Sequence, residues 1–211
     1  MRMKKIMSFL LMTVMVLSML PITAFAADNT ATTMRLAKTQ GTVTVTNATD
    51  KVVKQTDNMK LYNGYKLKTD AESYAWISLD DTKAAKLDAN SELSVQKNGK
   101  KLTLYLSSGN VFFNVKETLK GDESLNIKTS TMTMGIRGTS GCVRVINPRV
   151  SEVHLMTGTV EVLVEHPEIN LSKTAIITAG SVATSLIDTE AMEVSGKPVE
   201  IVIEKLEEET V

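Results

Sequence analysis

The sequence predicts an all-β protein of many short strands, arranged either as a β-solenoid or roll or as a β-sandwich. Three observations support this prediction. Apolar and polar residues alternate with period two along most of the chain after residue 26, so each segment can bury one face and expose the other. Turn-forming pairs interrupt the alternation about every 10 to 20 residues. Helical spacing of apolar residues is almost absent after residue 26.

Residues 1–26 have the features of an export signal. Basic residues precede an almost purely apolar run, Ile6–Leu20, which Pro21 ends, and Ala24 and Ala26 are the small residues of a cleavage site. The run is about 15 residues long, which is short for a membrane span of roughly 20. We therefore expect cleavage after Ala26, and secretion or display at the cell surface. The alternative is an uncleaved signal, and only then would the protein contact a membrane.

The rest of the chain is expected to form one domain. We predict a flexible polar lead over residues 27–35, a β domain over residues 36–186, and a C-terminal strand and acidic tail over residues 187–211. The signal contains three basic and no acidic residues, so the mature chain has 21 basic and 24 acidic residues and a net charge of −3. A nearly neutral chain without a basic stripe is a poor candidate for nucleic-acid binding.

The alternating segments are the predicted strands, and the pair Asn98-Gly99 predicts a hairpin. It separates two alternating segments and is expected to form a two-residue turn with positive φ at both positions. The last alternating segment, Val199–Ile203, either caps an open sheet edge or is offered to a partner as a strand. Listed in chain order, the apolar positions expected to face the core are Val43, Val45, Leu102, Leu104, Leu106, Val111, Phe113, Val115, Leu125, Ile127, Met132, Met134, Ile136, Val143, Val145, Val153, Leu155, Val160, Val162 and Val164.

Four blocks of sequence recur in a recognisable order and spacing. They are Gln40–Val45; Leu61–Thr69 with Ser73–Thr82; Asn90–Leu93 with Leu104–Phe112; and Ile127–Thr129, Gly135–Thr139 and Val143–Val145, followed by Val153–Val160 and Ala179-Gly180. Together these blocks resemble the FecR domain, which is named for the iron-citrate regulator. Two departures are Tyr65 and Asp81-Thr82, which stand where the family usually has Asp and Asp-Gly.

The resemblance implies an all-β, solenoid-like or roll-like fold and an extracytoplasmic module that binds or relays a signal through protein contacts. Family members that act as anti-sigma regulators carry a cytoplasmic segment and a membrane span before the domain. Because only a signal peptide precedes the domain in this sequence, we do not extend the expectation to a sigma factor. The expected partner is another envelope or secreted protein. The alternatives are a structural module of the cell envelope and a carbohydrate-binding module.

The segment Arg137-Gly138-Thr139 is a candidate recognition site or structural corner. Glycines recur every three residues at Gly135, Gly138 and Gly141, where they permit positive φ or the close approach of another backbone. Arg137 either pairs with an acidic residue inside the domain, which we favour, or presents its guanidinium group to a carboxylate of a partner.

Tyr74 and Trp76 form a candidate aromatic surface. They are two residues apart on a predicted strand and therefore share one face. This face either packs into the core, which we favour, or forms a platform on which a sugar stacks. Cys142 is the only cysteine, so the chain forms no internal disulfide, and we expect a small buried core residue at this position.

No motif predicts catalysis, a metal site or a cofactor. His154 and His166 are isolated from other residues at ligand spacing, and Asp80, Asp81 and Asp88 lack the regular spacing of a calcium loop. Nucleophile elbows, zinc-hydrolase motifs and phosphate-binding loops are absent from the sequence. We therefore expect a protein that is not an enzyme.

Overall fold

The described part of the chain consists of strands, turns and loops, which confirms the all-β prediction. The predicted signal peptide, most of the predicted lead and the end of the acidic tail lie outside it. Within the described residues, no helix is long and apolar enough to cross a membrane. The computed structural model describes residues 34–117, 119, 123–166, 171–187 and 199–206.

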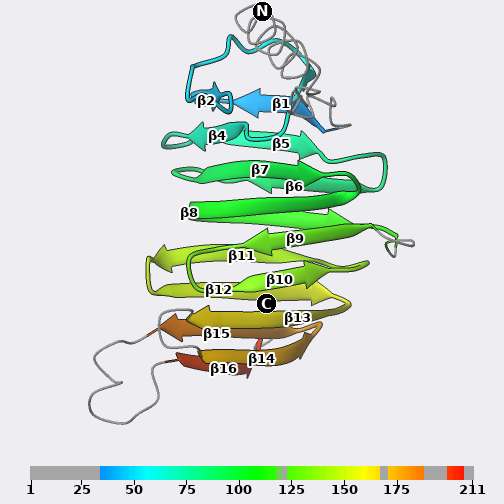
Figure 1. Ribbon diagram of the computed structural model, residues 1–211, viewed down its shortest axis with the longest axis vertical. Helices are drawn as coiled ribbons and strands as arrows, with labels where there is room; N and C mark the ends of the chain where they lie inside the picture. The colour runs from blue at the N-terminus through cyan, green and yellow to red at the C-terminus, as the bar shows by residue number, and fades with distance from the viewer. Residues whose placement is uncertain (1–33, 118, 120–122, 167–170, 188–198, 207–211) are drawn as a thin grey trace, which may run out of the picture.

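The strands form two layers that face each other, and within each layer the strands follow one another along the long axis of the molecule (Figure 1). In chain order they are β1 (Arg35–Gln40), β2 (Val43–Thr46), β3 (Met59–Lys60), β4 (Lys66–Thr69), β5 (Tyr74–Ser78), β6 (Lys83–Leu87), β7 (Glu92–Asn98), β8 (Lys101–Val115), β9 (Ser124–Lys128), β10 (Thr133–Ile136), β11 (Ser140–Asn147), β12 (Val150–Thr157), β13 (Thr159–His166), β14 (Leu171–Thr178), β15 (Ser181–Ile187) and β16 (Val199–Lys205).

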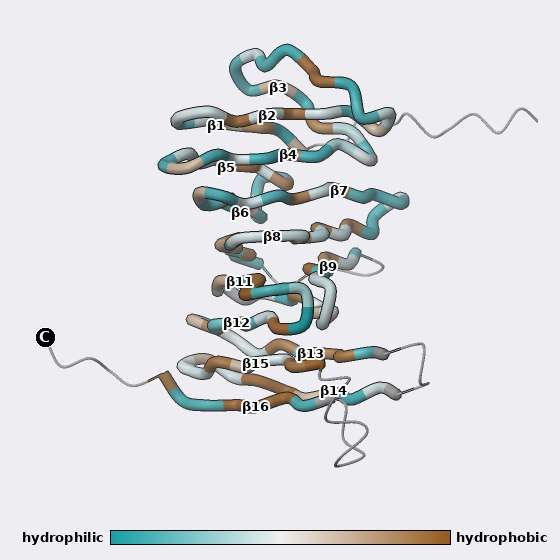
Figure 2. The backbone as a smooth tube through the Cα atoms, turned by 90° about the vertical axis from the view of Figure 1, so that its left-hand side faces the viewer, coloured by the Kyte–Doolittle hydropathy of each residue, from teal (hydrophilic) through white to brown (hydrophobic). Residues whose placement is uncertain are grey.

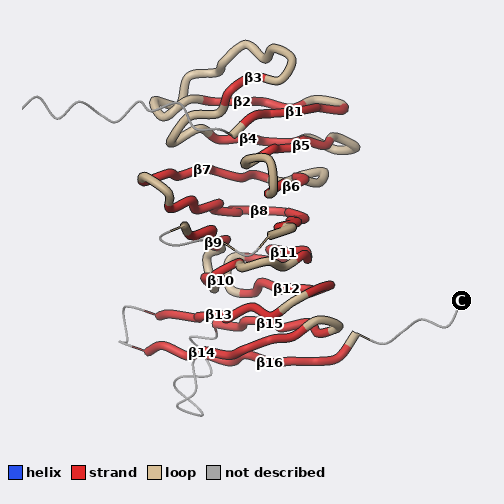
Figure 3. The backbone as a smooth tube through the Cα atoms, turned by 90° about the vertical axis from the view of Figure 1, so that its right-hand side faces the viewer, coloured by secondary structure: helices blue, strands red, loops and turns tan. Residues whose placement is uncertain are grey.

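One layer, sheet A, has the strand order β3-β1-β5-β6-β8-β11-β12-β15-β16, and the other, sheet B, has the order β2-β4-β7-β8-β9-β10-β13-β14. Strand β8 belongs to both. Its first part pairs with β7 and β9, and its second part, from Gly109 onward, pairs with β6 and β11. The β8–β9 pair is parallel, while the other pairs are antiparallel. The two layers face each other as in a sandwich, while the chain passes repeatedly between them as in a roll (Figure 3).

The core lies between the two sheets and is built from aliphatic side chains and methionine. Of the apolar positions predicted to face it between Val43 and Val164, all are buried except Val145, which is half-buried. Figure 2 shows the resulting alternation of hydrophobic and hydrophilic residues along the strands. Aromatic residues make up only 4% of the chain, so branched aliphatic residues supply most of the buried apolar surface.

The predicted hairpin exists, but its turn is one residue later than expected. Asn98 pairs with Lys101 across β7 and β8, so the two-residue loop is Gly99-Lys100. Gly99 has a φ of 58°, whereas Asn98 is not among the described residues with positive φ. The prediction of positive φ at Asn98 is therefore wrong. A positive φ at the first loop residue needs only one glycine, and the preceding Asn98 remains free to extend the ladder.

The two ends of the sandwich differ. At the N-terminal end a loop covers the edge strands: β3 pairs with β1, Thr46 forms a bridge to Val52, and the Val53 amide donates a 2.8 Å hydrogen bond to the Val45 carbonyl. At the C-terminal end β14 and β16 are the last strands of the two sheets. The predicted strand Val199–Ile203 is thus part of β16, and it pairs along its length with β15, as the capping alternative requires.

Candidate functional site

The outer face of sheet A carries a row of alternating cationic and aromatic side chains. The strand register places Lys38 of β1 opposite Trp76 of β5, Trp76 opposite Lys86 of β6, and Lys86 opposite Phe112 of β8. Tyr74 lies on the same face as Trp76 because the two are separated by one residue of β5. We call Lys38, Tyr74, Trp76, Lys86 and Phe112 the aromatic–lysine cluster.

The ammonium groups of this cluster lie over the rings. The Nζ atom of Lys86 is 4.4 Å from the ring centroid of Tyr74, 5.5 Å from that of Phe112 and 5.7 Å from that of Trp76. Lys38 Nζ lies 4.9 Å from the Trp76 ring. The Tyr74 and Trp76 rings are 6.2 Å apart and tilted by 47°. Each such cation–π contact contributes about 0.5–1 kcal/mol where it is exposed to water, so the contacts hold the rings in place.

The cluster lies outside the hydrophobic core, so the prediction that Tyr74 and Trp76 are core residues is wrong. Both are half-buried, while Ala75 and Ile77 on the opposite face of β5 are fully buried. Because side chains of a strand alternate between its faces, two aromatic residues flanking a buried alanine must point outward. The shared face predicted for Tyr74 and Trp76 is present, and this face is the outer one.

Cys142 and His154 continue the row of outward-facing side chains on sheet A. Cys142 of β11 lies opposite Phe112 and opposite His154 of β12, whose Nε2 is 3.3 Å from Glu152 Oε2. Cys142 is half-buried on the outer face, so its predicted place in the core is wrong: the buried neighbour Val143 takes the inward position. Burial raises the pKa of the Cys142 thiol to about 11, so it is protonated and weakly nucleophilic at neutral pH.

The segment Arg137-Gly138-Thr139 connects β10 of sheet B to β11 of sheet A. Arg137 is exposed and forms no ion pair or hydrogen bond with any described residue, so the internal pair that we favoured stays a prediction. Gly138 has a φ of 67°, as expected of a corner glycine. Thr139 is buried, and its Oγ1 has no hydrogen-bond partner among the described residues. This corner is separate in the fold from the aromatic–lysine cluster, which lies on β1, β5, β6 and β8.

The third glycine of that series has a packing role. A side chain at Gly141 would bring its Cβ within 3.0 Å of the Phe113 ring and closer still to the His154 carbonyl oxygen. Gly135 meets no such obstacle, since the nearest atom to a Cβ there is 3.8 Å away. Of Gly135 and Gly141, the expected close approach of another backbone therefore occurs only at Gly141.

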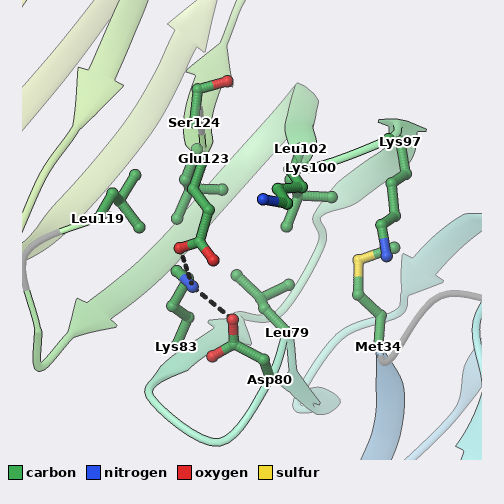
Figure 4. Close-up of a pocket in the computed structure, with 12 residues that line it drawn as sticks. Met34, Leu79, Asp80, Lys83, Lys97, Lys100, Leu102, Leu119, Glu123 and Ser124 are labelled. Carbon is green, nitrogen blue, oxygen red and sulfur yellow. Dashed lines mark hydrogen bonds and ion pairs between the residues drawn. The ribbon is translucent and has the colours of Figure 1, made fainter. Parts of the chain in front are cut away.

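Sequence reasoning missed an ion-pair group beside a cavity of about 280 Å³ (Figure 4). Lys83 pairs with Asp80 and, at 3.6 Å, with Glu123. Burial alone would raise the pKa of Asp80, but hydrogen bonds from Lys83 and Thr82 lower it. Asp80 is held by its near neighbours Thr82 and Lys83, while Glu123, the second partner of Lys83, is distant in sequence, so the sequence did not reveal the group. Leu79, Leu102 and Leu125 are among the apolar lining residues, and the ion pairs join the loop before β6 to the start of β9.

No group of three or more histidine, cysteine, aspartate or glutamate residues that could hold a metal ion occurs in the part of the chain that the structure describes. His154 has Glu152 as its neighbour, and Cys142 beside it is protonated at neutral pH. The cluster itself offers ring faces and ammonium groups, and the Asp88 carboxylate lies 3.9 Å from Lys86 Nζ.

Comparison with known proteins gives a family and a fold. Two crystal structures, at 1.65 Å and 2.50 Å resolution, of a protein described as a putative anti-sigma factor from Parabacteroides distasonis ATCC 8503 each superpose with a TM-score of 0.50 at 16% identity. Each match covers 66% of this chain and 59% of that one, so the chain spans little more than half of that protein. No curated protein sequence matches this chain. Residues 65–161 match the family described as FecR protein, which confirms the resemblance to the FecR domain over that part of the chain.

Proposed function

We propose that the protein is an exported, non-catalytic signal-relay module that binds another envelope or secreted protein through the aromatic–lysine cluster. The observation that carries the proposal is the position of Trp76 and Tyr74 on an outer sheet face, with Lys86 beside them. Tryptophan and tyrosine on a rigid surface are typical of the residues that dominate binding energy at protein interfaces, and the lysine ammonium groups beside them add positive charge. Tyr74, Trp76, Lys86 and Phe112 all lie within residues 65–161, the FecR match.

The opposite face of the sandwich supports the choice of sheet A. The outward positions of the neighbouring strands β7 and β8 in sheet B include Ser94, Gln96, Thr103 and Tyr105. Three of these four are small or amide side chains, which offer hydrogen bonds but little apolar area. A partner that binds sheet A gains ring surface together with two ammonium groups, so we expect it to present apolar and acidic residues.

Trp76 makes the proposal directly testable, because it is the only tryptophan in the chain. Binding at the cluster should change its fluorescence, and a candidate partner protein can be titrated against this signal. Lys86→Ala together with Tyr74→Ala should weaken binding about tenfold or more, since several interface contacts are lost at once. Ser94→Ala with Thr103→Ala on sheet B is the matched control and should bind like the wild type. Equal binding by both double variants would exclude the cluster as the contact surface.

A carbohydrate-binding module is the second candidate, and the position of two neighbouring aromatic rings, Tyr74 and Trp76, on an outer sheet face favours it. A sugar ring stacking on Trp76 would also change its fluorescence, so the same titration with soluble peptidoglycan fragments and neutral oligosaccharides separates the two functions. A saturable signal with sugar alone would replace the protein partner by a glycan. If the protein is a structural module of the cell envelope, neither the partner protein nor the sugars should give a saturable fluorescence signal.

Export is a separate prediction with its own measurement. N-terminal sequencing of protein recovered from culture medium or from the cell surface should begin at Ala27, because Ala24 and Ala26 fit the specificity of signal peptidase. Recovery in the membrane fraction with Met1 retained would instead indicate an uncleaved anchor.

A further inference from the structure

The C-terminal end of the sandwich concentrates exposed apolar residues. Among the described residues, eight large hydrophobic side chains are exposed, and four of them lie at this end. They are Ile176 of β14 (68% exposed), Val202 and Ile203 of β16 (46% and 47%), and Leu206, which follows β16 (41%). Isolated exposed apolar residues are common on protein surfaces. Three of these four, Val202, Ile203 and Leu206, lie on or next to β16, so exposed apolar side chains gather at the last strand of sheet A.

Both sheets end at these strands. In the described structure β16 pairs only with β15 and β14 only with β13, while β14 and β16 contact each other across the sandwich (Figure 1). Ile203 lies opposite Ala183, which is buried in the core, so Ile203 points inward and yet is half-exposed. One more strand beside β16 would bury it. The N-terminal end differs because β3 and the Val52 bridge cover its edges.

The charges around the edge of β16 select among possible occupants. Glu200 and Glu204 are exposed and lie on the outer face, on either side of Val202. Five glutamates and one lysine occur between Val199 and Val211. A second copy of β16, paired antiparallel and centred on Val202, would place Glu200 opposite Glu204 of the other copy twice. Like charges that lie directly opposite each other destabilise a strand pair.

We propose that the edge of β16 is a docking site for an extended segment of a partner protein that has apolar residues flanked by basic ones. The main-chain groups of the edge supply hydrogen bonds, and alternate side chains supply selectivity. In an antiparallel arrangement, basic residues four positions apart face Glu200 and Glu204, and the apolar residues between them cover Val202 and Ile203. This surface is separate from the aromatic–lysine cluster, so the proposal stands or falls independently of the proposed function.

The test uses the mature protein and a synthetic peptide, Thr-Lys-Val-Val-Val-Lys-Thr, with a fluorescent label. Its affinity is measured by fluorescence anisotropy, and amide hydrogen exchange locates the contact. We expect saturable binding, with slower exchange at β16 on adding the peptide. The control peptide Thr-Glu-Val-Val-Val-Glu-Thr, and the lysine peptide N-methylated at alternate residues, should both bind at least about tenfold more weakly.

A charge-reversed variant makes the test specific to this edge. Glu200→Lys with Glu204→Lys should lose affinity for the lysine peptide by about tenfold or more and gain affinity for the glutamate peptide. Asp57→Lys with Asp81→Lys makes the same net charge change at exposed positions elsewhere and should leave the preference unchanged.

Several outcomes would overturn the proposal. The proposed charge complementarity would be contradicted if the wild type bound both peptides equally. It would also be contradicted if the Glu200/Glu204 variant kept the wild-type preference. Amides on the free edge of β16 that are already protected in the isolated monomer would mean that the chain covers its own edge. Concentration-dependent dimerisation in light scattering that protects β16 would assign the edge to a second copy. Slower exchange at β16 on adding lipid vesicles, but not on adding the peptide, would assign the apolar group to a membrane surface.

Discussion

The two halves of the chain cross between the sheets at corners that share a backbone conformation but differ in side-chain chemistry. In the first half, Gly41 and Gly109 have φ values of 73° and 77°, and each lies against a buried serine. The amide that follows each glycine donates a 2.9 Å hydrogen bond to that serine, Thr42 to Ser73 Oγ and Asn110 to Ser91 Oγ.

In the second half the corresponding corner pairs Gly158, with a φ of 83°, with Thr139. The Thr139 methyl group faces the glycine: a Cβ on Gly158 would lie 2.5 Å from Thr139 Cγ2. The hydroxyl is buried and has no partner in the described structure. The same corner is therefore held by a satisfied hydroxyl in one half and by a methyl contact, at the cost of an unsatisfied hydroxyl, in the other.

Both kinds of corner bring two chain segments into close contact. A serine hydroxyl makes hydrogen bonds at this contact in the first half, and a threonine methyl group packs there in the second. Ser73 and Ser91 also donate to the carbonyls of Ala71 and Ala89, at 3.0 Å and 2.9 Å. Each serine thus accepts one hydrogen bond and donates another within a tight corner. Thr139 lacks both, so the halves should respond differently to equivalent substitutions.

The largest effect is expected from Gly109→Ala. A Cβ there would lie 2.6 Å from Ser91 Cα, and the positive φ disfavours any L side chain. We expect a loss of about 3 kcal/mol or more in the free energy of unfolding, combining backbone strain and overpacking. Gly99→Ala is the matched control, because Gly99 also has positive φ but no atom lies within 4 Å of its Cβ position. It should cost about 1 kcal/mol, through strain alone. Equal losses in urea denaturation would contradict the close approach at Gly109.

An intermediate effect is expected from Ser91→Ala. The change leaves the partly buried Asn110 amide and the Ala89 carbonyl without their partner, which should cost about 2 kcal/mol in unfolding free energy. Ser94→Ala, on the half-exposed outer face of β7, is the control and should change stability by less than about 0.5 kcal/mol. If thermal denaturation shows the two variants to be alike, the serine is not what holds the first-half corners.

Much of the fold could be predicted because it depends on local alternation. The period-two pattern identified the inward positions, and the hairpin at Gly99 was located to within one residue. The corners could not be foreseen in the same way. Asp70-Ala71-Glu72-Ser73 and Asp88-Ala89-Asn90-Ser91 share the pattern Asp-Ala-x-Ser, with φ near 50° at the third residue of each, but the glycines that they contact are distant in sequence.

The candidate site was predictable only in part, for the same reason. The separation of Tyr74 and Trp76 places them on one face of β5. Burial of Ala75 and Ile77 on the other face determines that the aromatic face points outward. The contribution of Lys86 depends on strand pairing, which brings it over the rings from another strand. Alternation along a strand specifies which side chains share a face. The register between strands specifies which side chains of neighbouring strands contact each other, and one sequence does not reveal that register.

The smallest effect, and the sharpest test of the comparison, is expected at Thr139. Thr139→Val keeps the shape of the side chain and the contact with Gly158 but removes the buried, unpaired hydroxyl. Because burying a polar group without a partner is unfavourable, we expect the free energy of unfolding to rise by up to about 1 kcal/mol. Thr139→Ser removes the methyl contact instead and should lower it by about 1 kcal/mol.

Ser91→Thr provides the reciprocal measurement in the first half. A methyl group added there has to fit against the backbone at Gly109, where even a Cβ on the glycine would meet Ser91, so the variant should be destabilised. Calorimetry of these variants together with Ser91→Ala, in a common background, tests the comparison. Removing the hydroxyl should stabilise the protein in Thr139→Val and destabilise it in Ser91→Ala if the hydroxyl is the stabilising group in one half and the methyl in the other. A loss of stability in Thr139→Val comparable to that in Ser91→Ala would show that the Thr139 hydroxyl does have a partner in solution, and the two corners would then be chemically alike.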